Sequence, residues 1–281
     1  MAYTAEISRT NPSCFLFLID QSGSMAEPFA GQPDTRKAHE VAAAVNRLLQ
    51  TLVLRCAKGH EVLDRFHVGV IGYGSGNVGP ALGGALAGQV LVPISKIAAN
   101  PLRVEQRTKR TPDGAGGLIE QTIKFPVWFE PAAKGKTPMC QALDLAWNSL
   151  TEFLNQYAGC YPPMVINITD GMATDGDPRP HAECIRDLAS RDGSVLLFNV
   201  HLSARSATPI ELPDQEAGLP DDFSKLLFRM SSVLPPGMRE TAQREGYRVT
   251  EATRGFVFNG DLVSVIRFLD IGTRVDARNL R

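Results

Sequence analysis

Apolar residues occur in short runs along the chain, and several of these runs end at a glycine or an acidic residue. Residues 15–19 are all apolar and lead directly into Asp20, and the run at 164–169 leads into Asp170. Runs of this length, bounded by residues such as Pro12 and Gly23, predict strands that are buried on both faces. The runs at 66–73, 194–201 and 255–259 predict three further strands.

Apolar residues at intervals of three and four predict helices between these strands. The clearest helix would begin near Asp34, a candidate N-cap, and end near Cys56; its apolar face would contain Ala38, Val41, Ala42, Val45, Leu48, Leu49 and Leu52. Similar patterns predict helices at 139–157, 180–191, 222–232, 238–245 and 262–275. Strands that alternate with helices predict an α/β fold: a doubly wound, mostly parallel central sheet with helices on both faces and one antiparallel edge strand.

The segment from about residue 74 to residue 130 departs from this alternation. Residues 90–97 and 123–129 predict strands, whereas the stretch between them, 103–117, is polar and basic and then rich in glycine. The segment has too few apolar residues for a core of its own, so we expect an elaborated insert on the sheet edge. The chain would then be a single domain over 1–281 with a core at about 14–275.

Composition excludes several classes of function. Lys and Arg number 29 against 30 Asp and Glu, and the formal net charge is −1, so no nucleic acid or anionic membrane is expected as a partner. No apolar stretch reaches the roughly 20 residues of a membrane helix. Five scattered cysteines predict free thiols in a reducing compartment, and we expect a cytoplasmic protein.

Oxygen-bearing side chains gather where the predicted strands end. Asp20, Ser22 and Ser24 follow the first strand, Asp170 follows another, and Thr137 precedes the helix at 139–157. The carboxyl ends of parallel strands share one edge of the sheet, so these five residues can surround a single cation. Carboxylate and hydroxyl oxygens suit a hard cation such as Mg²⁺. Ser22 or Ser24 could instead simply cap the next helix.

The sequence resembles a von Willebrand factor A domain. Asp20-Gln21-Ser22-Gly23-Ser24 matches the Asp-x-Ser-x-Ser motif of that family's metal-ion-dependent adhesion site, while Thr137 and Asp170-Gly171 match its second and third loops. The resemblance implies a non-enzymatic module in which Mg²⁺, or else Mn²⁺ or Ca²⁺, accepts an Asp or Glu side chain from a partner protein. It also implies that Ser22, Ser24 and Thr137 contact the metal directly, and that Asp20 and Asp170 often act through water.

Among members of the family, the chain is similar to the stand-alone intracellular bacterial type. That type is associated with tellurium-resistance, kinase–phosphatase and defence-like gene sets. The resemblance therefore implies a role within a bacterial multi-protein stress, signalling or defence system.

Two alternatives remain open from the residues. Asp20 could be the nucleophile of a Mg²⁺-dependent phosphohydrolase, although such enzymes carry Asp-x-Asp and Ser22 stands at the second acidic position. The metal site could also be purely structural in a scaffold protein. A nucleotide-binding loop is excluded, because Gly135-Lys136-Thr137 lacks the first glycine of that motif and Glu130 stands there.

Overall fold

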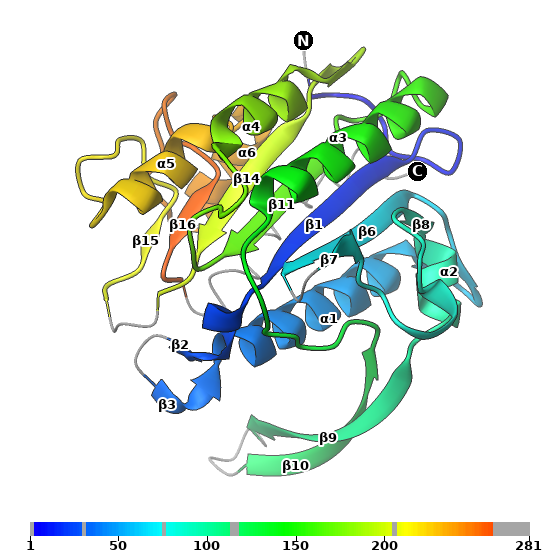
Figure 1. The fold of residues 1–281 in the computed structure, drawn as a ribbon. Coiled ribbons are helices and arrows are strands. Elements are labelled where there is room, and N and C mark those ends of the chain that lie inside the picture. Colours follow the sequence, from blue (N-terminus) through cyan, green and yellow to red (C-terminus); the bar gives the residue numbers. More distant parts are fainter. Residues whose placement is uncertain (1–2, 30–31, 75–76, 113–117, 204–206, 261–281) are drawn as a thin grey trace.

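The computed structural model describes residues 3–29, 32–74, 77–112, 118–203 and 207–260. Its centre is an eight-stranded mixed sheet with the strand order β15-β16-β14-β11-β1-β6-β7, in which β8 also pairs with β6 (Figure 1). Five strands are mutually parallel: β1 (Ser13–Gln21), β6 (Phe66–Gly74), β11 (Met164–Thr169), β14 (Leu196–His201) and β16 (Phe256–Phe258). The predicted α/β fold with a mostly parallel sheet is confirmed.

Antiparallel strands occur at both edges of the sheet, whereas only one such edge was expected. β7 (Asn77–Pro80) and β8 (Val92–Pro93) run antiparallel to β6, and β15 (Ile210–Glu211) runs antiparallel to β16. The additional edge strand comes from a short pairing of two residues, which is too brief to leave a pattern in the sequence.

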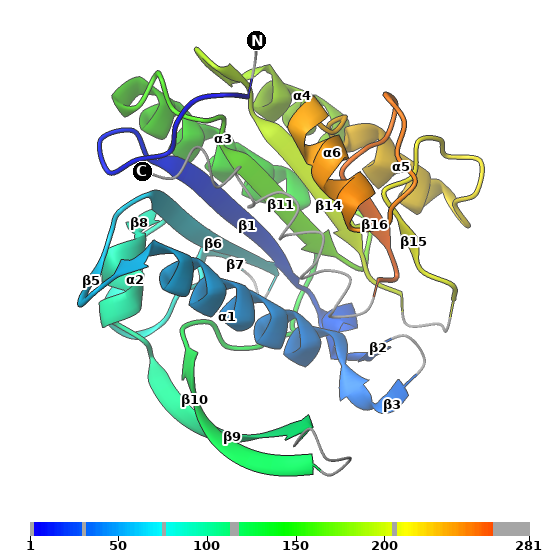
Figure 2. The same cartoon turned by 180° about the vertical axis from the view of Figure 1, so that it is seen from behind.

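Helices cover both faces of the sheet (Figures 1 and 2). Residues of α1 (Lys37–Cys56), α2 (Ile94–Ala99) and α6 (Pro236–Arg244) belong to the buried cluster on one face. Residues of α3 (Met139–Gln156), α4 (Pro178–Asp187) and α5 (Asp222–Met230) belong to the cluster on the other face. Short 3-10 helices, η1 (Gly23–Ala26) and η2 (Gly84–Leu86), lie in connecting segments.

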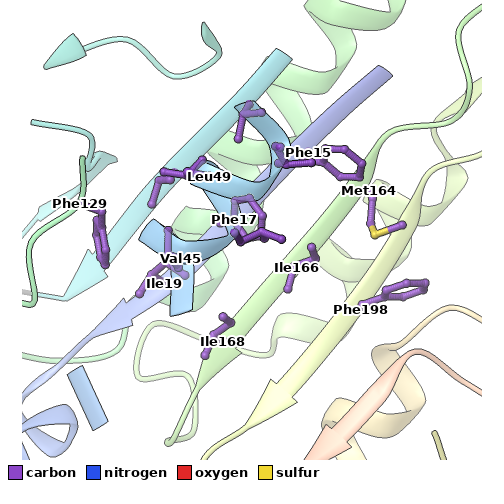
Figure 3. Packing of buried hydrophobic residues seen from close by; sticks show 14 of the residues in the cluster. Phe15, Phe17, Ile19, Val45, Leu49, Phe129, Met164, Ile166, Ile168 and Phe198 are labelled. Atoms are coloured by element: carbon purple, nitrogen blue, oxygen red, sulfur yellow. The ribbon is translucent and has the colours of Figure 1, made fainter. Parts of the chain in front are cut away.

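Strand β1 is buried on both faces, as its continuous apolar run predicts. Phe15, Phe17 and Ile19 pack into the cluster on the α1 face (Figure 3). Leu16 and Leu18 pack into the cluster on the α3 face. Because side chains alternate along a strand, Asp20 continues the α3-facing series at the end of β1.

Helix α1 begins later than expected. Asp34 lies in β3 (Gln32–Arg36), which pairs with β2 (Pro28–Phe29), and the helix starts at Lys37. The expected N-cap at Asp34 is therefore wrong. The apolar face of the helix is as predicted, and Figure 3 shows Val45 and Leu49 over the sheet.

The segment that follows β6 differs from the sequence expectation in two places. The apolar run at 90–97 contains only the two-residue strand β8, after which helix α2 begins beyond Pro93. Polar residues that predicted no strand form β9 (Arg103–Pro112), which pairs with β10 (Leu118–Val127) in a separate two-stranded sheet. Figure 1 shows this long hairpin standing away from the central sheet below α1.

Other expected elements agree within a few residues. The helices predicted at 139–157, 180–191, 222–232 and 238–245 correspond to α3, α4, α5 and α6, while the last predicted helix, at 262–275, lies outside the described residues. Small hairpins complete the fold: β4 (Ala57–Lys58) with β5 (Glu61–Val62), and β12 (Ala189–Ser190) with β13 (Gly193–Ser194). Within the described ranges, every helix is too short or too polar to cross a membrane. All five cysteines are unpaired.

Candidate metal centre

Three loops meet at the carboxyl edge of the central sheet. Asp20 ends the apolar part of β1, and the chain turns there into η1 with Ser22 as its N-cap. Asp170 follows β11, which lies beside β1 and parallel to it. Thr137 comes shortly before α3, whose first turn reaches the same edge (Figure 1). This is the arrangement that the strand-end argument predicts.

Backbone hydrogen bonds join the loop after β1 (the first loop) to the loop before α3 that carries Thr137 (the second loop). The Gly23 N–H donates to the Gly135 carbonyl at 3.0 Å, and the Lys134 N–H donates to the Gln21 carbonyl at 2.7 Å. Gly135 has a φ of +85°, a left-handed conformation that glycine adopts without steric cost. The loop that carries Thr137 is therefore fixed against the loop that carries Ser22 and Ser24.

Hydrogen bonds also join the second loop to the loop after β11 that carries Asp170 (the third loop). The Thr174 N–H donates to the Thr137 carbonyl at 2.9 Å, and the Thr137 N–H donates to the Thr174 hydroxyl at 3.1 Å. The Asp175 carboxylate accepts the N–H groups of Cys140 and Gln141 at 3.1 and 3.0 Å, so it caps α3 from another loop. The position of Thr137 is thus set by contacts on both sides.

Hydroxyl and carboxylate oxygens from two loops form one hydrogen-bonded chain. Ser24 Oγ donates to Asp170 Oδ1 at 2.7 Å, and the oxygens of Ser22 and Ser24 lie 3.1 Å apart. Because Ser24 has one hydroxyl proton and gives it to Asp170, Ser22 is the donor to Ser24. This direction leaves lone pairs of both serines available to a cation.

The Thr137 side chain borders the same place. The residue is 5% exposed, and a Cβ atom built on Gly171 would lie 3.7 Å from its Oγ1 and 3.9 Å from Ser24 Oγ. The hydroxyls of Thr137 and Ser24 therefore flank Gly171 from two sides. The structure brings Ser22, Ser24, Thr137 and Asp170 together as the sequence predicts.

Asp20 lies deeper than the other four residues. It is fully buried, its Oδ1 accepts the Ser22 N–H at 2.8 Å, and its Oδ2 accepts the Thr169 hydroxyl at 2.6 Å. Burial raises the pKa of Asp20 to about 6; the hydrogen bonds from Thr169 and Ser22 oppose this rise, and the nearby Asp170 adds to it. The two accepted hydrogen bonds tie the carboxylate to the loop after β1 and to the end of β11.

A buried lysine that is not among the five predicted residues also enters the site. Lys37 is 2% exposed, and its Nζ lies 2.7 Å from Asp170 Oδ2 and 3.1 Å from Glu27 Oε2. The Glu27 side chain is 55% exposed. One signal for Lys37 exists in the sequence, because it precedes Val41 by four positions and so shares the buried face of α1.

The donor set fits a hard divalent cation. It consists of two carboxylates and three hydroxyls, all oxygen, on loops that hydrogen bonds hold in place. In the described part of the chain there is no cluster of three or more His, Cys, Asp and Glu side chains that could hold a metal. The five residues could hold Mg²⁺ only through their hydroxyls together with the two acids.

Thr169 is a second residue that the motif does not contain. Its hydroxyl bonds to Asp20 and lies 3.1 Å from the Gly171 carbonyl oxygen. A threonine at the last position of a buried strand is ordinary for β structure, so the sequence offers no signal for this role.

The rim of the site carries positive charge and one apolar side chain. Lys134 and Lys136 flank Gly135 on the loop before Thr137, and both are exposed. Met172, two residues after Asp170, is 65% exposed. Asp177, on the loop between β11 and α4, caps α4 by accepting the Arg179 N–H at 3.0 Å.

Between pH 7 and pH 4, His201 is expected to reduce the stability of the protein by about 3 kcal/mol. His201 ends β14 beside the site, packs against Phe223 and Phe258, and its Nδ1 has no partner among the described residues. Burial lowers the pKa of His201 to about 4, against the opposing pull of Asp221 and Asp170. A lowered histidine pKa means that the stabilisation is present above about pH 6.5 and is lost as the pH falls through 4.

Urea unfolding of wild type and His201→Phe at several pH values tests this. The phenyl ring keeps the packing and cannot be protonated, so the variant should gain on the wild type as the pH falls. A difference that stays constant with pH would contradict the expectation.

The fold and site together define an α/β protein in which oxygen-bearing side chains from three loops gather at the carboxyl edge of the sheet. No protein-family model and no curated protein matches the chain. Similar solved structures include proximal thread matrix protein 1 from the mussel byssus, with a TM-score of 0.39 and 16% identity over 79% of this chain and 42% of that one.

The vWF domain of the type V pili tip protein Mfa5 from Porphyromonas gingivalis is also similar, with a TM-score of 0.32 and 14% identity over 58% of this chain and 39% of that one. A structure of three N-terminal domains of Mfa5 gives a TM-score of 0.32 and 13% identity over 58% of this chain and 20% of that one. The chain spans less than half the length of each of these three structures.

Proposed function

We propose that the chain is a metal-dependent protein-interaction module of the von Willebrand factor A type, and not an enzyme. The observation that carries this proposal is the hydrogen-bonded chain from Ser22 through Ser24 to Asp170, with Thr137 on the adjacent loop. These side chains come from three loops, and backbone hydrogen bonds between the loops hold them in place.

Mg²⁺ is the cation that this oxygen set suits best, and when bound it would offer an electrophilic position to an acidic side chain of a partner. Ser22, Ser24 and Thr137 would bind the cation directly. Asp20, whose oxygens already accept two hydrogen bonds, would act on the cation through water and would hold the conformation of the loop after β1.

The rim supports an acidic partner. The exposed Lys134 and Lys136 stand beside the Thr137 loop, where they would attract carboxylates and speed association. Met172 provides an exposed apolar contact on the opposite loop. A protein segment with a central Asp or Glu and further acidic residues around it matches this surface.

The geometry of Asp20 argues against the phosphohydrolase alternative. A carboxylate nucleophile must reach the substrate phosphorus, whereas Asp20 is fully buried and both of its oxygens accept hydrogen bonds. No observation favours catalysis strongly enough to carry a second proposal.

Thr137→Val is expected to weaken Mg²⁺ binding on the order of tenfold or more, since a valine keeps the shape of the side chain and removes its oxygen. Isothermal titration of the full chain with Mg²⁺ and with Mn²⁺ measures this. The matched control is Thr151→Val on α3, whose hydroxyl donates to the Trp147 carbonyl at 2.8 Å; this change should leave metal affinity unchanged. Equal binding by both variants would remove Thr137 from the site.

The partner chemistry has a separate test. An array of acidic peptides, each paired with a copy in which the central Glu is Gln, is probed with the full chain in Mg²⁺ and in EDTA. The proposal requires binding that needs both the metal and the carboxylate. Peptide binding that persists in EDTA would favour the alternative in which the metal is purely structural. Mg²⁺ binding without binding of any peptide would favour the same alternative.

A further inference from the structure

Lys37 occupies an unfavourable position for a lysine. It is the first residue of α1, where the helix dipole opposes a positive charge, and its side chain is 3% exposed. A buried ammonium is costly unless anions and hydrogen bonds compensate it. Two acids do so here: Asp170 at 2.7 Å and Glu27 at 3.1 Å.

The Asp170 side chain is completely buried and has no other cationic partner among the described residues. Its Oδ1 accepts the Ser24 hydroxyl and its Oδ2 accepts Lys37. Lys37 therefore neutralises, from within the protein, the same carboxylate that belongs to the candidate metal site. A divalent cation at this site and the Lys37 ammonium would compete for one anion and repel each other.

Glu27 offers Lys37 a second position. Its carboxylate lies at the end of η1, its side chain is 55% exposed, and its backbone carbonyl accepts the Lys37 N–H at 3.2 Å. The Lys37 ammonium can leave Asp170 and keep Glu27 without becoming an unpaired buried charge.

We infer that Lys37 is an internal counter-cation of the site: its ammonium pairs with Asp170 in the metal-free state, and it leaves Asp170 and keeps only Glu27 when a divalent cation binds. Lys37 thereby lowers the affinity for metal and keeps the metal-free site assembled. This inference rests on the proposed metal-binding function, because it concerns the regulation of that same site.

Lys37→Met tests the competition. The methionine fills the same space without charge, so Mg²⁺ affinity by isothermal titration should rise on the order of tenfold. In EDTA the same variant should melt at a lower temperature than the wild type, because Asp170 loses its counter-ion; in saturating Mg²⁺ this deficit should shrink. Tighter binding together with lower metal-free stability is a combination that a merely structural lysine would not produce.

The control is Lys136→Met, which removes a nearby positive charge that is exposed on the rim. It should change Mg²⁺ affinity by less than about threefold, because solvent screens an exposed charge. An equal gain in Mg²⁺ affinity in both variants would mean that any nearby positive charge has the effect assigned to Lys37, and would overturn the inference. If wild type binds Mg²⁺ and Lys37→Met binds no more tightly, the inference alone fails; if neither binds Mg²⁺ or Mn²⁺, the proposed function fails as well.

A measurement on the unchanged protein guards against a variant that does not fold. Acetic anhydride labels accessible lysine amines, and peptide mass spectrometry reports the extent at Lys37 and at Lys136. Mg²⁺ should increase labelling of Lys37 relative to Lys136, because the ammonium moves toward the exposed Glu27. Unchanged or decreased labelling of Lys37 in a protein that binds Mg²⁺ would refute the exchange.

Discussion

Asp20→Asn is expected to raise the free energy of unfolding of the metal-free protein by about 1–3 kcal/mol, although it removes Mg²⁺ binding. Burial raises the pKa of Asp20 from 3.8 to about 6, so the ionised carboxylate is a net cost to the fold at neutral pH. A neutral amide of the same shape avoids that cost. The buried Asp20 carboxylate therefore lowers the free energy of unfolding of the metal-free protein at neutral pH.

The hydrogen bonds around Asp20 tolerate the amide. Its oxygen can still accept the Ser22 N–H, and its nitrogen can donate to Thr169 Oγ1. Thr169 can then turn its own proton to the Gly171 carbonyl, which lies 3.1 Å away. No buried polar group loses its partner, which is why a gain is expected in place of the usual loss.

Urea unfolding in EDTA at pH 7.5 measures the effect, with the exposed Asp222→Asn as a control that should stay within about 0.5 kcal/mol. For an acid with a raised pKa the stabilisation is present below about 3.8 and is lost as the pH rises through about 6. The advantage of the variant should therefore grow over this interval. His201 has the opposite sign over nearly the same range, but it is common to both proteins and cancels in their difference.

Adding Mg²⁺ provides the second half of this test. Mg²⁺ should stabilise the wild type by mass action and leave Asp20→Asn unchanged. A variant that is less stable than the wild type in EDTA at pH 7.5 would contradict the cost assigned to the buried carboxylate. A variant that Mg²⁺ stabilises as much as it does the wild type would remove Asp20 from the site.

Local patterns predicted the centre of the fold and the members of the candidate site. The apolar run before Asp20 predicts a strand buried on both faces, and parallel strands end at one edge, so Asp20 and Asp170 were expected at the same edge. The pairing of β1 with β11 then places the two residues at the ends of neighbouring strands. The spacing of apolar residues at three and four positions located α1 and α3, because this spacing places them on one face of a helix. Such inferences need only neighbours along the chain and one general rule of topology.

Contacts between distant and chemically unremarkable residues could not be predicted in this way. The Lys37–Asp170 pair joins residues 133 positions apart, and neither residue type signals the other. Strand β9 was missed because its residues are polar and do not alternate with apolar ones. The strand is held by its pairing with β10, where the Arg107 guanidinium also stacks over the Phe125 ring at 3.6 Å. Pro93 ended the expected strand early, since it leads into helix α2.

Asn46→Ala is expected to destabilise the protein by about 3–5 kcal/mol, although a polar residue in the middle of α1 would ordinarily be read as exposed. Asn46 is 3% exposed, and its amide joins α1 to the chain that leaves β10. Its Oδ1 accepts the N–H groups of Trp128 and Phe129 at 2.7 and 3.0 Å, and its Nδ2 donates to the Phe129 carbonyl at 2.8 Å.

Alanine would leave these three backbone groups buried without partners. Trp128 and Phe129 are 2% and 1% exposed, and Phe129 packs in the same cluster as Val45 and Leu49 (Figure 3), so water cannot easily replace the amide. Each unsatisfied buried group costs roughly 1–3 kcal/mol. The same amide anchors the base of the β9–β10 hairpin, because the chain at 128–129 is the continuation of β10.

Urea unfolding of Asn46→Ala against Asn148→Ala measures the difference, since Asn148 is exposed on α3 and should change stability by less than about 0.5 kcal/mol. Hydrogen exchange locates it: the amides of Trp128 and Phe129 should lose protection in Asn46→Ala before those of β1 do. If both variants unfold with the same free energy, the amide is replaced by water and the hairpin must be held by other contacts. The Gly83–Trp128 and Leu102–Val127 backbone bonds, at 2.9 and 2.7 Å, would then be the remaining anchors.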